Sequence, residues 1–345
     1  MNNYIRKARV GVRLVCGAVV GLGAPALADH MGPGSVGSGG SLSVMSPDTL
    51  DEGHAALGFR LTYTRPEQRS DTELADLSDH GIDAHNTDYN LNASIGAAYG
   101  VTHHLTVSAE LPYVRRDRLR AAEGGTVERL GTVSGIGDLN LLAKYRVPTG
   151  AGASFALFGG IKVPTGGTGK RGPGGERLET EHQPGTGSWD PIAGAAFGAK
   201  VGPVALSMGA LYQWSTQGAQ RTRLGDRLQG GIAVSHQFSG APPMHHDGPN
   251  HHHGDELDEH ADDAHRASWD AFVELTGEWE GRQAIAGEVE RASGGAAIWL
   301  APGVRFITTS GLSLAASAGA PLWQHIRKSH PDNKLRLTIA VGKAF

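Results

Sequence analysis

The sequence predicts an all-β protein, a transmembrane up-and-down antiparallel β-barrel of about twelve strands, with ten or fourteen as alternatives. Apolar and polar residues alternate with a period of two in stretches of about ten residues, which is typical of strands that cross a membrane. The connections between these stretches alternate between long and short. Beyond the N-terminal region no run approaches about 18 consecutive apolar residues, so membrane-spanning helices are excluded.

Residues 1–28 are predicted to be a cleavable export signal. Four basic residues between Arg6 and Arg13 precede the short apolar run Leu14–Leu22, and Ala26–Ala28 is a small-x-small cleavage site. Cleavage removes the single cysteine, Cys16, so the mature chain has no thiol for metal binding or catalysis. It also leaves 27 basic against 35 acidic residues, a net charge of −8 that argues against nucleic-acid binding.

The mature chain is predicted to have two parts. Residues 29–50 form an N-terminal segment whose stretch Gly32–Ser43 is rich in Gly and Ser, and it is either a tether or a strap inside the lumen. Residues 51–345 form the barrel, which carries a polar insert at 239–267. A barrel of twelve strands leaves a narrow lumen that a strap of chain or a few side chains can block.

The twelve predicted strands follow one another along the barrel domain. In the fourth, for example, Leu139, Leu141 and Ala143 alternate with Asp138 and Asn140. Five tryptophans, at positions 189, 214, 269, 279 and 323, lie at or near stretch ends, as an interfacial girdle requires. The stretches are 57–63, 90–99, 105–113, 138–147, 154–163, 189–201, 204–214, 228–238, 269–279, 296–306, 311–323 and 334–345.

The polar faces of these stretches carry charges of both signs. Lipid cannot solvate such charges, so in a membrane barrel this face must line the lumen. The charged residues either form a salt-bridge network that fills the barrel or a constriction that selects solutes by charge. A secreted β-sandwich is the alternative fold, and the alternation of connection lengths argues against it. The predicted lumen residues are Arg60, Glu110, Asp138, Lys144, Arg146, Lys162, Glu274, Lys334 and Arg336.

Connection lengths predict the topology. The long connections, at about 66–86, 116–135, 165–187, 217–225, 281–294 and 324–333, are expected outside the cell. The short ones, at about 100–103, 148–152, 201–203 and 308–310, are expected in the periplasm together with both termini. The insert 239–267 breaks the rule, because parity requires a short periplasmic turn there.

The insert is rich in histidine and carboxylates, which are ligands for Zn²⁺, Ni²⁺ and Cu²⁺. No HExxH motif or other fixed spacing is present, so the sequence predicts a flexible metal-binding loop, with a solvated acidic linker as the alternative. No cofactor is required by any motif. Five histidines on outer loops, at positions 80, 85, 182, 325 and 330, receive no role. The predicted metal ligands are His245, His246, His251, His252, His253, His260 and His265.

A family resemblance is carried by Gly135–Arg146, which resembles the GxGDxxLxxKYR segment of an outer-membrane barrel family labelled MetA-pathway of phenol degradation, or simply transporter. Gly160–Gly166 and Gly185–Asp190 are similar to its next two landmarks, and Tyr99–Thr102 to its first periplasmic turn. The chain's last residue, Phe345, resembles the signature by which such barrels are recognised for assembly, although Lys343 departs from it. The resemblance implies an outer-membrane barrel of uncertain substrate.

The expected location is therefore the outer membrane of a Gram-negative type of cell, with membrane lipid, the barrel-assembly machinery and a periplasmic metal-handling protein as expected partners. The favoured function is a channel or transporter for a small solute, linked to transition-metal handling through the insert. One alternative is a non-conducting anchor that presents the metal-binding loop to a periplasmic partner. The other is an outer-membrane hydrolase, but no Ser/His/acid grouping stands out, so an enzyme is not expected.

Overall fold

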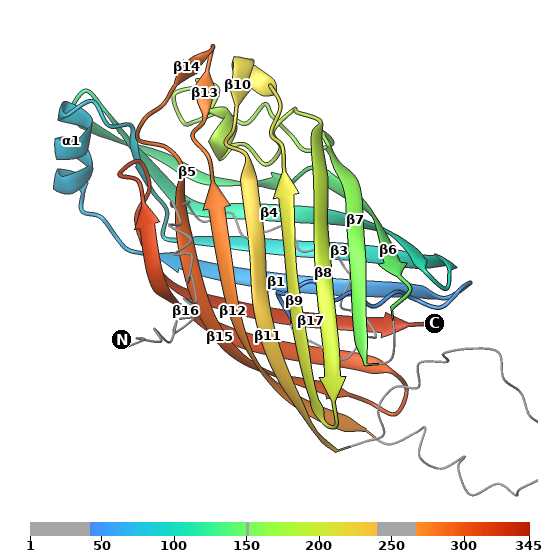
Figure 1. Cartoon of the computed structure of the whole chain (residues 1–345). Helices are drawn as coiled ribbons and strands as arrows, with labels where there is room; N and C mark the ends of the chain where they lie inside the picture. The colour runs from blue at the N-terminus through green and yellow to red at the C-terminus, as the bar shows by residue number, and fades with distance from the viewer. Residues whose placement is uncertain (1–41, 150–151, 240–266) are drawn as a thin grey trace, which may run out of the picture.

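The computed structural model describes residues 42–149, 152–239 and 267–345, which form a closed antiparallel β-barrel (Figure 1). Each barrel strand pairs with the next, and the last strand pairs with the first, as in the register Phe59 with Val341. The twelve-stranded prediction is confirmed. The strands are β1 (Ala55–Pro66), β3 (Tyr89–Thr102), β4 (Leu105–Glu123), β5 (Thr126–Ile136) with β6 (Leu139–Val147), β7 (Ala153–Val163), β8 (Asp190–Val201), β9 (Val204–Gln213), β11 (Arg227–Ser239), β12 (Ser268–Glu280), β15 (Gly295–Ile307), β16 (Leu312–Ile326) and β17 (Asn333–Ala344).

β5 and β6 together occupy one position in the barrel, because both pair with β4. The strand is interrupted between them at Gly137 and Asp138, where the Gly137 amide donates to the carbonyl of Pro112 at 2.8 Å. We call the end of the barrel with the long connections the loop end. The opposite end, where short turns and β17's C-terminal Ala344 lie, is the turn end (Figure 1).

Two of the predicted long loops contain regular structure instead. The connection 66–86 contains helix α1 (Asp71–Asp79) and strand β2 (Ala84–Asn86). The helix begins at an N-cap, in which the Ser70 hydroxyl accepts a bond from the Glu73 amide at 3.1 Å. The connection 116–135 is a β-hairpin of β4 and β5, and its charged residues on both faces concealed it because strands outside the membrane need no apolar face.

Short elements complete the loop end. A small sheet joins β10 (Thr222–Arg223), β13 (Ala284–Ile285) and β14 (Glu288–Val289), so the β9–β11 and β12–β15 connections are tied together. Two 3-10 turns are present, η1 (Thr180–His182) and η2 (Ala219–Arg221). Within the described ranges, no helix is long and apolar enough to cross a membrane.

The two faces of the wall differ as alternation predicts. Outward-facing Ile95, Leu157 and Ile339 are about half exposed, and so are many of their neighbours, which is the apolar surface that hydrocarbon requires. Trp269 packs on Phe306 near the turn end, and Trp214 packs on Tyr212 at the loop end, which places aromatic pairs at both rims. Buried residues line the inside of the barrel and also pack between the loop-end elements, and among them polar and charged side chains outnumber apolar ones.

Because the outer face must meet lipid, a charge there should be costly in a depth-dependent way. Ile339 lies midway along β17, whereas Val201 faces outward at the turn end of β8. We expect Ile339→Arg to lower the free energy of unfolding by about 2–4 kcal/mol, and Val201→Arg by about 0–1 kcal/mol. Unfolding by denaturant in phospholipid vesicles measures both, and equal losses would contradict this orientation of the wall.

Candidate functional site

Residues 42–50 run inside the barrel, and we call them the internal segment. The Ser43 amide donates to a Glu274 carboxylate oxygen on β12 at 2.5 Å. The Lys144 ammonium on β6 donates to the Ser46 carbonyl at 3.3 Å. The Leu50 amide donates to the hydroxyl of Thr106 at 2.9 Å. These bonds come from β4, β6 and β12, so the segment is held by different sides of the wall.

Apolar contacts also hold the internal segment. Met45 belongs to a buried cluster with Leu142, Phe158, Ile192, Ala196 and Leu211, which are inward-facing residues of β6, β7, β8 and β9. Leu42 packs in a second cluster with Phe272 and Ala315. The sequence prediction left a tether and a strap open for Gly32–Ser43. Positions 32–41 lie outside the described residues, while Leu42 and Ser43 lie within the barrel.

Glycines in the wall provide the space that the internal segment occupies. A Cβ on Gly209 would lie 3.0 Å from Met45 Cβ and 3.0 Å from the Met45 carbonyl oxygen. A Cβ on Gly198 would lie 2.9 Å from Pro47 Cγ, and one on Gly231 would lie 2.9 Å from Val44 Cγ2. These close approaches require residues without a side chain, so the wall of β8, β9 and β11 is shaped to the segment.

The structure places most of the predicted lumen residues in the interior. Buried among them are Glu110, Asp138, Lys144, Lys162 and Glu274, whereas Arg60, Arg146 and Arg336 are partly buried. Lys334 differs, because it lies at the outer rim and its half-exposed ammonium pairs with Glu67 at 2.6 Å.

Lys162 lies in a buried three-residue ion cluster. Its ammonium is 2.6 Å from an Asp190 carboxylate oxygen and 3.3 Å from one of Asp138. Asp138 also accepts bonds from the amides of Gly166 and Thr186, at 2.9 and 2.8 Å, and so holds both ends of the β7–β8 connection. Asp190 was not predicted as an interior residue, although it follows a tryptophan at the start of a stretch whose alternation places it on the polar face.

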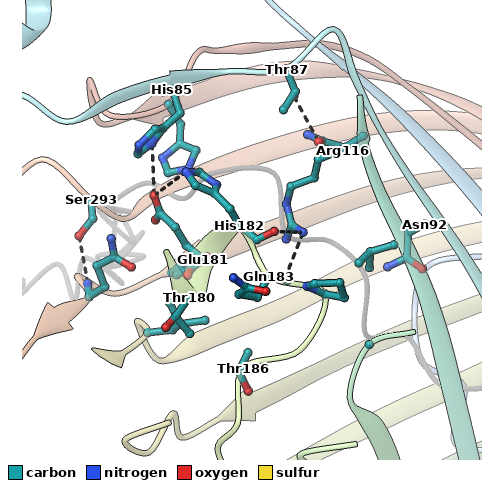
Figure 2. A pocket seen from close by; sticks show the side chains of 18 of the residues that line it. His85, Thr87, Asn92, Arg116, Thr180, Glu181, His182, Gln183, Thr186 and Ser293 are labelled. Carbon is teal, nitrogen blue, oxygen red and sulfur yellow. Dashed lines mark hydrogen bonds and ion pairs between the residues drawn. The ribbon is translucent and has the colours of Figure 1, made fainter. Parts of the chain in front are cut away.

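Cavities lie toward both ends of the barrel. The turn-end cavity has a volume of about 520 Å³ and is lined by Ser46, Asp48, Arg146, Lys200 and Asp270, among others. The loop-end cavity (Figure 2) has a volume of about 130 Å³, and its wall includes Asp138 and Lys162. The buried residues from Leu42 to Pro47 pack against the inward faces of the strands that run from one end of the barrel to the other.

The β7–β8 connection forms much of the roof of the loop-end cavity. Arg116 reaches it from β4 and donates to the carbonyl of Gln183 at 3.3 Å (Figure 2). The Gln183 side chain accepts from the Lys170 amide at 2.8 Å and donates to the Leu178 carbonyl at 2.7 Å. Hydrogen bonds therefore hold the β7–β8 connection both to the barrel wall and within its own fold.

Titratable groups are concentrated in this roof. Burial raises the pKa of Glu181 to about 8, and the neighbouring Glu179 acts in the same direction. Burial together with His85 lowers the pKa of His182 well below its usual value. Burial lowers the pKa of His330 to about 3. The structure thus brings together His85, His182 and His330, three histidines to which the sequence assigned no role, because no motif or spacing links their three connections.

The predicted metal ligands of the insert, His245, His246, His251, His252, His253, His260 and His265, lie outside the described residues. The flanking residues Ser239 and Ser268 end β11 and begin β12 at the turn end. Eight barrel strands precede the insert, as parity predicted.

Comparisons with known proteins give the fold. No protein-family model matches the chain, and no curated protein sequence matches it. The solved COG4313 outer membrane channel from Pseudomonas putida F1 is 16% identical with a TM-score of 0.56, covering 88% of this chain and 100% of that one. The NanC porin is 8% identical with a TM-score of 0.41, covering 84% and 98%.

The likeness to the Pseudomonas putida F1 channel carries the argument, and at this identity it shows the fold. The chain has the fold of an outer-membrane β-barrel. A twelve-stranded barrel also fits the transporter-type family that the segment Gly135–Arg146 resembles.

The buried ion cluster makes a testable prediction. Lys162→Met removes the cation between two buried carboxylates, so we expect the free energy of unfolding to fall by about 3–5 kcal/mol. Lys334→Met removes the cation of an exposed pair and should cost less than about 1 kcal/mol. Denaturant unfolding in vesicles compares the two. A small loss for Lys162→Met would mean that water or another cation reaches Asp138 and Asp190.

Proposed function

We propose that this protein is an outer-membrane channel for a small solute and that the internal segment closes it in the conformation described here. The observation that carries the proposal is the polar, charge-lined interior of a closed barrel in which residues 42–47 lie between cavities at the two ends. Gly198 and Gly209 leave room for residues 45–47, which supports a specific seat for this segment in the lumen.

The contacts of the internal segment support a plug that can leave. Its described hydrogen bonds to the wall, made with Glu274, Lys144, Thr106 and the His103 carbonyl, lie outside the strand pairing of the barrel. Withdrawal of the segment would therefore leave every strand pair intact. It would also leave the charged residues of the wall facing water, which favours passage of polar solutes.

The second part of the proposal concerns transition metals and rests on sequence. The insert 244–265 carries seven of the chain's 17 histidines together with seven carboxylates. We propose that it binds a divalent ion such as Zn²⁺, Ni²⁺ or Cu²⁺ at the periplasmic side. The residues that flank it, Ser239 and Ser268, lie at the turn end together with β17's C-terminal Ala344, which supports that side for a barrel inserted from the periplasm.

Planar-bilayer conductance tests the closure. We expect the full-length protein to conduct rarely and a variant lacking residues 31–47 to conduct in most insertions. Gly209→Val should also raise the open fraction, because the three atoms nearest to a Cβ at this position all belong to Met45. The matched control is Gly277→Val on β12, where a Cβ would meet nothing within 4 Å.

Two outcomes would contradict the proposal. If the deletion variant is as silent as the parent, the barrel is a non-conducting anchor. If the parent is already as open as the deletion variant, the internal segment does not close the lumen. Heat-modifiable migration in gels confirms in each case that the barrel is folded.

A further inference from the structure

The roof of the loop-end cavity contains a compact group of two histidines and two glutamates. His85 lies on β2 in the β1–β3 connection, while Glu179, Glu181 and His182 lie in and beside η1 in the β7–β8 connection. One ligand atom from each of these four side chains lies within 4.8 Å of all the others. Figure 2 shows the Glu181 carboxylate between the rings of His85 and His182.

The distances place Glu181 at the centre of the group. Its Oε1 atom is 3.2 Å from His85 Nδ1 and 3.6 Å from His182 Nε2. Glu179 Oε2 is 3.9 Å from His85 Nε2. Tetrahedral zinc has ligand bonds of about 2.0–2.2 Å to nitrogen and carboxylate oxygen, so ligand atoms at such a site lie a little over 3 Å apart. The four ligand atoms, all within 4.8 Å of one another, lie near that spacing.

The group is buried and incompletely satisfied. His85 and His182 are 3% and 4% exposed. Within the described residues, His85 Nδ1, His182 Nε2 and Glu179 Oε2 are buried and make no hydrogen bond, and their contacts inside the group are ion pairs of 3.2–3.9 Å. Buried polar atoms that make no hydrogen bond are few in native structures. Two such nitrogens, one from each histidine, face the same carboxylate oxygen, Glu181 Oε1, as the ligands of one ion would.

A carboxylate already orients one of the histidines. Asp83 Oδ1 lies 2.9 Å from His85 Nε2, so that nitrogen can donate its proton to Asp83 while Nδ1 faces Glu181. Metal-bound histidines characteristically donate their second ring nitrogen to a carboxylate in this way. The ring of His330, 5.7 Å from that of His85, closes the remaining side of the group.

We propose that His85, Glu179, Glu181 and His182 form a binding site for a divalent transition-metal ion of the Zn²⁺ type. Imidazole nitrogens and carboxylate oxygens together suit zinc, and the burial of the two histidines disfavours a hydrated ion such as Mg²⁺. The ion would join the β1–β3 connection to the β7–β8 connection and so fix the roof of the cavity. This site is distinct from the insert, whose flanking residues Ser239 and Ser268 lie at the opposite end of the barrel.

Zinc binding to the full-length protein in detergent tests the site. The parent and Glu181→Gln are titrated by equilibrium dialysis, each with and without residues 244–265, so that ions bound by the insert are counted separately. We expect the variant to bind one Zn²⁺ ion fewer in both backgrounds. His80→Ala is the matched control, because His80 is an exposed loop-end histidine paired with Asp76, and it should bind as the parent does.

Protection from trypsin provides a readout at the site itself. Arg171 and Arg177 are exposed in the β7–β8 connection, close before Glu179. Zn²⁺ should slow cleavage at both arginines in the parent and in His80→Ala, but not in Glu181→Gln. If His85 needs its carboxylate partner, Asp83→Asn should weaken zinc binding by about 10–100-fold while the ion count at saturation stays unchanged.

Two results would overturn the proposal. Equal zinc counts for the parent and Glu181→Gln in the background without the insert would show that the group is an ion-pair network between His85 and its carboxylates. Zinc-dependent protection at Arg177 that persists in Glu181→Gln would place the ion elsewhere. The double variant His85→Ala with His182→Ala removes both histidine ligands, so it must also bind one Zn²⁺ ion fewer than the parent. If it binds as many ions as the parent, the ion is not held by these histidines.

Discussion

The pairing of β1 with β17 is the constraint on which the rest of this structure depends. Within hydrocarbon every backbone amide and carbonyl needs a partner from the chain itself, and only a closed sheet supplies one for each strand. Closure fixes the alternation of faces all the way round the wall, because a slip of one residue would turn every side chain to the opposite face. The apolar outer surface and the charged interior are therefore two results of one register.

A closed barrel of this size must also solve the problem of its own interior. Charges confined away from bulk water are stable only when they are paired, and Lys162 between Asp138 and Asp190 shows how closely they are matched. Part of the remaining space is filled by the internal segment, whose residue Met45 meets inward-facing Leu142, Phe158 and Leu211. Ion pairs and apolar contacts thus lie side by side in the same small interior. The backbone of the segment passes close to Gly209, which has no side chain.

The strands were predictable because each one repeats the same physical requirement of a lipid-facing and a lumen-facing side. All twelve predicted stretches coincide with strands of the barrel. Outside the membrane that requirement ends, so the β4–β5 hairpin was read as a loop. Helix α1 could have been recognised from the pair Ser70 and Glu73. The group around Glu181 could not, because His85 and His182 meet only after the loops fold over the cavity.

The attachment of the internal segment separates the work of opening the lumen from the stability of the barrel. A plug formed by a loop between two strands is tethered at both ends, so its movement strains the wall. In the described part of the chain, residues 42–50 precede the first barrel strand, β1, and do not connect two strands. In the proposed channel, the work of opening is set by the hydrogen bonds of the segment and by the packing of Met45, while the persistence of the barrel is set by its strand pairing. Selection can tune how readily the lumen opens without altering how durable the barrel is.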